Sequence, residues 1–193
     1  MAEVLLFHHA LGLTSGVHSF ADRLRAAGHV VHTPDLFEGR TFAGVDEGVA
    51  HAQAIGFGTV LERGRAAAEG LPDRLVYAGA SLGVMPAALL AQTRPGAVGA
   101  LFLHGAVPLD EFGDGTWPDG VPLQVHTMAD DAWGDVDVAR QLGEQVPGAE
   151  VFRYPGDRHL FTDDSCADFD APAAALVLER ALDLLARVDA EPT

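Results

Sequence analysis

The sequence predicts an α/β fold in which a mostly parallel sheet carries helices on both faces. Short apolar runs alternate along the chain with longer stretches of helical periodicity. Parallel strands need crossover connections, and helices supply them on both faces of the sheet. The 193 residues are about one domain in length, and they contain neither an internal repeat nor an interdomain linker. We therefore expect residues 1–193 to form a single domain.

The expected strands are compact apolar runs bounded by turn-forming or charged residues. The first is Val4-Leu5-Leu6-Phe7, and a later run, Leu75 to Ala78, leads directly into a serine flanked by glycines. In chain order, the expected strands are residues 4–7, 29–32, 74–78, 97–103, 122–126 and 150–154.

The expected helices lie between these strands. Phe20, Leu24 and Ala27 recur at helical spacing in the first of them. Residues 42–70 contain one broken helix or two short ones, because Gly56 and Gly58 interrupt the pattern. The remaining expected helices are residues 17–27, 82–93, 136–145 and 171–187.

The composition excludes several classes of function. Twelve basic residues against 28 acidic ones give a net charge of −16, so phosphate backbones and anionic membranes are repelled. The chain has no lysine, which excludes Schiff-base chemistry, a pyridoxal-phosphate aldimine and a Walker-A phosphate site. It also has no asparagine, so the acid of a catalytic triad must be Asp or Glu. We expect a small molecule as the partner, and neither nucleic acid nor a membrane.

The cellular setting is read from one cysteine and from the N-terminus. Cys166 is the single cysteine, so no internal disulfide can form, and Met1 runs into a strand without a basic signal-peptide region. No apolar run approaches the roughly 18 residues that span a bilayer. We therefore expect a cytoplasmic monomer or homodimer.

The segment Gly79-Ala80-Ser81-Leu82-Gly83 is the strongest chemical signal. Gly-x-Ser-x-Gly is a weak pattern alone, but here it follows a predicted buried strand and precedes a predicted helix. A strained strand-to-helix elbow needs small residues around the serine. The helix dipole and the Leu82 N–H then favour negative charge beside the hydroxyl. Ser81 is the predicted nucleophile.

The predicted base is His159, which stands in a loop after the strand at residues 150–154 and before the last helix. Three aspartates compete for the orienting acid in the loop after residues 122–126. Asp131 is the preferred candidate, Asp130 the near alternative and Asp135 the distant one. The order Ser81, Asp131, His159 is that of the α/β-hydrolase fold.

The loop after the first strand reads His8-His9-Ala10-Leu11-Gly12-Leu13. In α/β-hydrolases this position supplies the second oxyanion donor, so the Ala10 N–H joins that of Leu82. His8 and His9 could suggest a metal pair, but adjacent residues at a strand end point to opposite faces. We therefore predict no metal and no cofactor.

The chain resembles the dienelactone hydrolase family from Val4 to Leu185. The matching segments are residues 9–14, residues 33–37, the Ser81 elbow, the Asp131 loop and residues 156–161. The resemblance implies a core of eight strands or slightly fewer. It also places Ser81 where the type enzymes carry cysteine, and assigns the oxyanion hole to Ala10 and Leu82.

The chain departs from that family in two further places. His9 replaces a glutamate of the first loop, and Leu160-Phe161-Thr162-Asp163-Asp164 contains none of the arginine that binds the substrate carboxylate after the catalytic histidine. The resemblance therefore points away from an anionic dienelactone. Acidic side chains near the pocket favour neutral or cationic esters.

The sequence thus predicts a serine hydrolase that cleaves a small carboxylic ester or lactone through an acyl-enzyme. The chain is too short for a large lid domain. The alternatives are a non-catalytic binding protein of the same fold and a metal-dependent hydrolase. The long loop at residues 108–120 and other loops bring candidate residues to the mouth. The candidate pocket residues are His9, Leu11, Trp117, Trp133 and Phe161.

Overall fold

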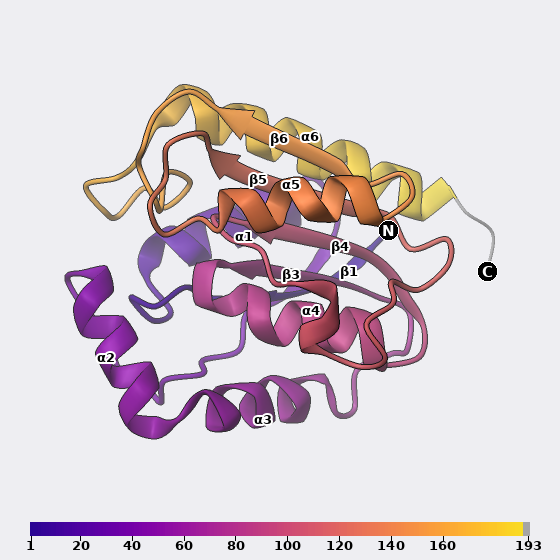
Figure 1. Cartoon of the computed structure of the whole chain (residues 1–193), viewed down its shortest axis with the longest axis horizontal. Coiled ribbons are helices and arrows are strands. Elements are labelled where there is room, and N and C mark those ends of the chain that lie inside the picture. The colour runs from indigo at the N-terminus through magenta and orange to yellow at the C-terminus, as the bar shows by residue number, and fades with distance from the viewer. Residues whose placement is uncertain (191–193) are drawn as a thin grey trace.

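The computed structural model describes residues 1–190 and is built on a parallel sheet (Figure 1). The strand order is β2-β1-β3-β4-β5-β6, and every neighbouring pair is parallel. The six strands lie at the low end of the range that the family resemblance implies. They are β1 (Glu3–Phe7), β2 (Val30–His32), β3 (Leu75–Ala80), β4 (Ala97–Leu103), β5 (Leu123–Met128) and β6 (Glu150–Tyr154).

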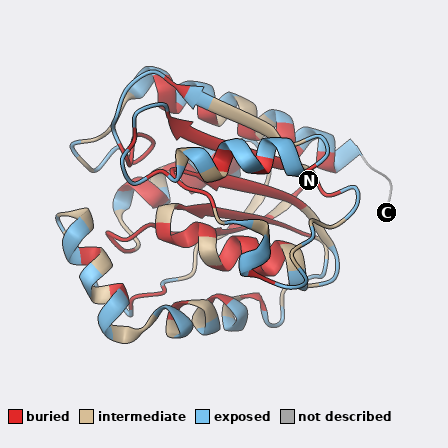
Figure 2. Cartoon of the chain, in the orientation of Figure 1, coloured by how far each residue is buried: buried red, intermediate tan, exposed pale blue. Residues whose placement is uncertain are grey.

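Helices cover both faces of the sheet, as the sequence predicts. The side chains of α1 and α6 pack on one face, and those of α2, α3, α4 and α5 pack on the other. The buried strands therefore lie between two apolar layers (Figure 2). The helices are α1 (Ser15–Ala26), α2 (Val45–Ile55), α3 (Phe57–Ala68), α4 (Val84–Thr93), α5 (Val136–Gln145) and α6 (Ala171–Ala190).

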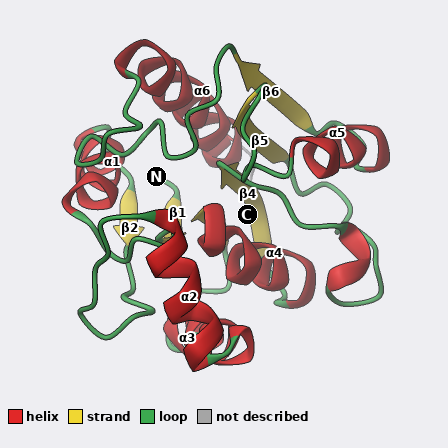
Figure 3. Ribbon diagram, turned by 60° about the vertical axis from the view of Figure 1, so that its left-hand side comes forward, coloured by secondary structure: helices red, strands yellow, loops and turns green. Residues whose placement is uncertain are grey.

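The segment between β2 and β3 forms two helices rather than one broken helix. Gly56 ends α2 and begins α3 with a φ of 87°, a conformation that glycine adopts without strain. In Figure 3, α2 stands in front of the strands. In the part of the chain that the structure describes, no helix is both long and apolar enough to cross a membrane.

The strand order reverses between β1 and β3, because β2 follows β1 on one side and β4 follows β3 on the other. Ligands of open α/β sheets bind outside the carboxyl ends of the strands at such a switch point. The first-strand loop and the Ser81 elbow both leave the sheet at this point. The topology therefore places the two expected oxyanion donors next to each other.

Candidate active site

Ser81 sits on a tight turn between β3 and α4. Its φ is 49°, a left-handed value that is strained for a residue with a side chain. Two glycines make the turn possible. A Cβ on Gly79 would lie 2.1 Å from the Gly83 carbonyl oxygen, and a Cβ on Gly83 would lie 2.5 Å from that of Phe7. The elbow therefore packs directly against the end of β1.

The structure brings Ser81, His159 and Asp131 into one hydrogen-bond chain. The Ser81 Oγ lies 2.7 Å from Nε2 of His159, and Nδ1 of His159 lies 2.8 Å from Oδ2 of Asp131. The second carboxylate oxygen of Asp131 accepts the Trp133 N–H at 2.9 Å. Both His159 and Asp131 are buried. The imidazole is thus oriented to take the serine proton at Nε2 and to donate from Nδ1.

Among the described residues, neither of the two other aspartates of this loop is hydrogen-bonded to His159, whose Nδ1 partner is Asp131. Asp130 has an exposed side chain, and its backbone N–H donates to the Gly156 carbonyl. Asp135 stands at the start of α5 with a left-handed φ of 48°, and its side chain makes no capping hydrogen bond to that helix. Partial burial raises the pKa of its carboxyl, against the opposing effect of the His159 charge.

Residues 8–14, which we call the oxyanion loop, are held by hydrogen bonds of the His8 side chain and of the loop's own backbone. Nδ1 of His8 lies 2.8 Å from the His9 carbonyl oxygen, while Nε2 accepts the Leu36 N–H at 2.9 Å. The His9 carbonyl also accepts the Gly12 N–H at 3.0 Å. Burial lowers the pKa of His8 to about 4, so this side chain is neutral near pH 7.

His9 joins the oxyanion loop to the loop after His159. Its Nε2 lies 2.7 Å from Oδ2 of Asp163, and its Nδ1 accepts the Leu11 N–H at 3.3 Å. Asp163 also accepts hydrogen bonds from the Thr14 hydroxyl and from the backbone and hydroxyl of Ser165. Burial acts to raise the pKa of Asp163, but these hydrogen bonds hold it well below its usual value.

A cavity of about 150 Å³ opens beside the serine hydroxyl. Pockets that bind drug-sized ligands have volumes of roughly 300–1,000 Å³, so this cavity suits a smaller molecule. Its wall is mostly apolar, and among the described lining residues Asp135 is the acidic one and none is Arg. It is lined by Ala10, Val45, Val49, Phe57, Ser81, Leu82, Met85, His104, Gly105, Ala106, Val107, Trp133 and Asp135.

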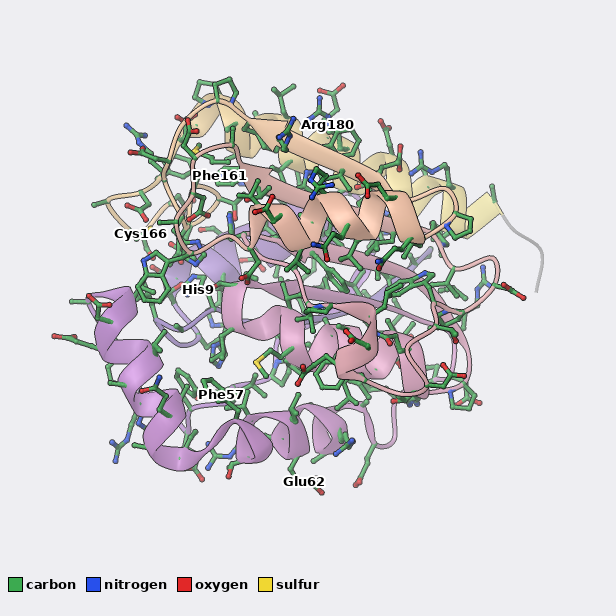
Figure 4. The ribbon with its side chains drawn as sticks, viewed as in Figure 1. His9, Phe57, Glu62, Phe161, Cys166 and Arg180 are labelled. Atoms are coloured by element: carbon green, nitrogen blue, oxygen red, sulfur yellow. The ribbon has the colours of Figure 1, made fainter. Side chains whose placement is uncertain are left out.

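The lining differs from the expected set of pocket residues. Trp133 lines the cavity, with 48% of its surface exposed. Trp117 does not, because its indole N–H donates to Val121 and its ring packs on Phe102. Phe161 is fully buried against the α1 and α6 layer. His9 and Leu11 bond to each other in the oxyanion loop and also lie outside the lining. The label in Figure 4 places His9 in that loop.

The sequence did not predict that α2 and α3 supply one side of the cavity wall. Val45 and Val49 come from α2, and Phe57 is the first residue of α3 at the corner between them (Figure 4). Their helical spacing is visible in the sequence, but that pattern says nothing of which surface the helix faces.

His104 is a further cavity residue that the sequence did not predict. It follows β4, lines the cavity, and has a left-handed φ of 61°. Its Nε2 bonds to the Thr162 hydroxyl at 2.7 Å, and its ring centre lies 6.2 Å from that of His159. Complete burial, and then the charges of neighbouring histidines, keep its pKa well below the usual value. It therefore presents a neutral ring behind the catalytic candidate.

The geometry gives little support to a metal-dependent hydrolase or to Cys166 as a nucleophile. His8 and His9 face different partners. Within residues 1–190, no three His, Cys, Asp or Glu side chains gather closely enough to hold a metal ion. The Cys166 thiol contacts the carbonyl oxygens of Leu160 and Asp163, and burial raises its pKa to about 11. A group with that pKa is a thiol, not a thiolate, near pH 7.

Comparisons with known proteins give the fold from solved structures and the family from a family model. No curated protein matches the chain. It is similar to a dienelactone hydrolase-like promiscuous phosphotriesterase from metagenomic libraries, with 19% identity and a TM-score of 0.80 over 97% of this chain and 87% of that one. A dienelactone hydrolase from Anabaena variabilis gives 17% identity and a TM-score of 0.71 over 97% and 86%.

A Thermus thermophilus protein has 17% identity and a TM-score of 0.71, over 99% of this chain and 90% of that one. Likeness at this level of identity shows the shared fold and confirms the predicted α/β-hydrolase class. A model of the dienelactone hydrolase family matches residues 1–189, nearly the whole chain. The chain is therefore a hydrolase that belongs to the dienelactone hydrolase family.

Proposed function

We propose that this hydrolase is a serine esterase that cleaves a small carboxylic ester or lactone through an acyl-enzyme. The observation that carries the proposal is the hydrogen-bond chain from Ser81 through His159 to Asp131, at 2.7 and 2.8 Å. A serine hydroxyl becomes a useful nucleophile only when a base is placed to take its proton. The strained φ of Ser81 supports the same role, because it presents the hydroxyl at the cavity.

The proposed reaction has two halves. In the first, the Ser81 oxygen attacks the ester carbonyl while His159 takes its proton at Nε2, and His159 then gives that proton to the leaving alcohol. Asp131 holds the imidazole and stabilises its protonated form. In the second half, His159 takes a proton from a water whose oxygen attacks the acyl carbonyl. His159 then gives that proton to the Ser81 oxygen as the bond from the acyl carbon to Ser81 breaks and the acid leaves. The Ala10 and Leu82 N–H groups stabilise the negative oxygen in both halves.

The cavity supports a preference for small uncharged substrates. Its lining is apolar apart from Ser81, His104 and Asp135. An anionic ester would lose its hydration there without gaining a cationic partner, and Asp135 would repel it. The chain also carries no lysine, and all of its basic residues are arginines.

Fluorophosphonate labelling tests the proposal. The wild-type protein should gain the mass of one phosphonyl group, and Ser81→Ala should gain none. Ser19→Ala serves as the matched control, because Ser19 lies on α1 and outside the cavity lining. Circular dichroism checks that all three proteins fold.

Two results would contradict the proposal. A folded wild-type protein that stays unlabelled and hydrolyses no aryl ester would instead support a non-catalytic binding protein. Hydrolysis that a chelator abolishes, and that survives Ser81→Ala, would support a metal-dependent hydrolase.

A further inference from the structure

We infer that two adjacent buried histidines, His8 and His9, hold the oxyanion loop in its working shape before substrate arrives. The inference rests on the proposed function, because it concerns the Ala10 N–H as a donor to the ester oxygen. Neither side chain lines the cavity. Both act through the backbone, so they are positioning residues.

The partners of His8 fix its tautomer. Nε2 faces the Leu36 N–H, which can only donate, so Nε2 carries no proton and accepts. Nδ1 faces the His9 carbonyl oxygen, which can only accept, so Nδ1 carries the proton and donates. The imidazole is therefore neutral, in agreement with its complete burial.

His8 thereby sets the orientation of one peptide group. The His9 carbonyl belongs to the same planar unit as the Ala10 N–H, and in a trans peptide the two point in opposite directions. No cis peptide occurs in the described chain. Hydrogen bonds from His8 Nδ1 and from the Gly12 N–H fix the carbonyl on one side. The Ala10 N–H is then directed to the other side, and Ala10 lines the cavity beside Ser81.

A flip of this peptide would have a large local cost. It would leave the buried His8 Nδ1–H and the Gly12 N–H without their acceptor, and buried donors without partners are unfavourable. It would also point a carbonyl oxygen at the place where negative charge develops. The hydrogen bonds of His8 thus keep the donor in place when no ester is bound.

His9 holds the next peptide group, between Ala10 and Leu11, and its imidazole is in the tautomer opposite to that of His8. Nδ1 accepts the Leu11 N–H, so the proton sits on Nε2 and is donated to Asp163. Asp163 lies four positions after His159 in the sequence and approaches the first turn of α1 closely. A Cβ on Gly16 would lie 1.7 Å from its Oδ1. His9 therefore couples the oxyanion loop to the segment that carries the base.

Two substitutions at His8 separate positioning from packing. The amide nitrogen of Asn reaches the place of Nδ1, so His8→Asn can keep the donor to the His9 carbonyl. Gln reaches the place of Nε2, so His8→Gln can keep the acceptor for the Leu36 N–H and loses that donor. The first readouts are kcat and KM on a neutral aryl acetate. The second is the affinity for a trifluoromethyl ketone, because the Ser81 oxygen adds to its carbonyl and forms a tetrahedral adduct with a negatively charged oxygen.

We expect His8→Gln to lower kcat about 100-fold with KM changed less than about threefold. Its affinity for the trifluoromethyl ketone should fall by the same factor as kcat/KM. His8→Asn should stay within about tenfold of the wild type in kcat. Equal losses in the two variants, or a folded His8→Gln with wild-type kcat, would overturn the inference.

Failure of the inference and failure of the proposed function are distinguishable. If the wild type is labelled by a fluorophosphonate and hydrolyses the acetate, only the role of the two histidines is in question. If neither His8 variant folds, the His9→Gln variant tests the inference instead. His9→Gln drops the acceptor for the Leu11 N–H and can keep the donor to Asp163. We expect a lowered Tm and about a tenfold loss of kcat, measured at a temperature at which the variant is fully folded. An unchanged kcat in that variant would reject the inference.

Discussion

The two sides of the cavity are built differently. The oxyanion loop side is made of buried polar groups, and the hydrogen bonds of His8, His9 and Asp163 hold it. The mouth is made of apolar side chains that reach solvent, with Phe57 at 38% and Trp133 at 48% exposure. The difference suggests a division of labour, in which the buried side fixes the reaction and the exposed side selects the substrate.

The largest effect is expected at Asp131, the acid of the proposed triad. Asp131→Asn should lower kcat by about 10⁴, because the amide no longer holds His159 in the correct tautomer. Steady-state kinetics on a neutral aryl acetate measures the loss. Asp130→Asn is the matched control, since its side chain is exposed and makes no bond to His159. A comparable loss in Asp130→Asn would mean that the acid has been assigned to the wrong residue.

A methyl group added to α2 at Gly48 should displace the backbone of the oxyanion loop at Ala10. A Cβ on Gly48 would lie 1.9 Å from the Ala10 carbonyl oxygen, whereas a Cβ on Gly58 meets nothing within 4 Å. We expect Gly48→Ala to lower kcat about 10- to 100-fold by displacing Ala10. Gly58→Ala should keep full activity and gain up to about 1 kcal/mol in stability from helix propensity. Equal activity of the two variants would show that the Ala10 position tolerates displacement.

The buried histidines should make the fold sensitive to acid. Burial lowers the pKa of His8 to about 4 and that of His126 to about 3, below the value of about 6.5 in an unfolded chain. Their contribution is fully present above pH 6.5, and it is lost as the pH falls toward these lower values because the unfolded state binds protons first. Each should reduce the free energy of unfolding by about 1.4 kcal/mol per pH unit in that window.

Urea denaturation at pH 7, 6 and 5 measures this slope. His126→Gln should remove one histidine's share of it. The groups that face His126 are the Tyr154 hydroxyl, the Gln124 amide, the Phe152 ring and the Arg180 charge, which also acts to lower its pKa. His18→Gln, an exposed substitution on α1, is the control. A slope that is the same in His126→Gln and the wild type would contradict the expectation.

The smallest effect is expected at the mouth. Three acetate esters of similar size carry a neutral, a cationic and an anionic end group: 3,3-dimethylbutyl acetate, acetylcholine and 2-sulfoethyl acetate, respectively. With each rate divided by that of hydroxide-catalysed hydrolysis, the sulfonate should be slower than the neutral ester by about tenfold in kcat/KM. Asp135→Asn should narrow that ratio and leave the neutral ester unchanged. A ratio near one in the wild type would remove the proposed charge preference.

The fold and the hydrogen-bonded Ser81, Asp131 and His159 were accessible from the sequence because their signals are local or topological. The elbow needs glycines at fixed positions, and the strand order brings the loops after β3, β5 and β6 to one edge. Asp131 could be preferred over Asp130 in the sequence, but only the structure shows which carboxylate meets the imidazole.

The lining was less accessible, because it depends on how distant segments pack. Trp117 lies in a long loop and was expected near the mouth. Its indole N–H instead donates to the carbonyl oxygen of Val121, four residues along the chain. Val49 was not expected there, since a helical pattern does not identify the surface that the helix covers. The tautomers of His8 and His9 depend on backbone partners that no spacing in the sequence specifies.

The helix pair α2–α3 has a consequence for how new substrate specificities could arise in this fold. It contributes Val45, Val49 and Phe57 to the mouth but no atom to the hydrogen-bond chain of Ser81. Replacing this helix pair with that of a relative, between β2 and β3, would therefore change the substrate-contacting side chains and leave the hydrogen-bond chain intact. One constraint would travel with the graft: a glycine must face the Ala10 carbonyl, because only a residue without a Cβ fits there.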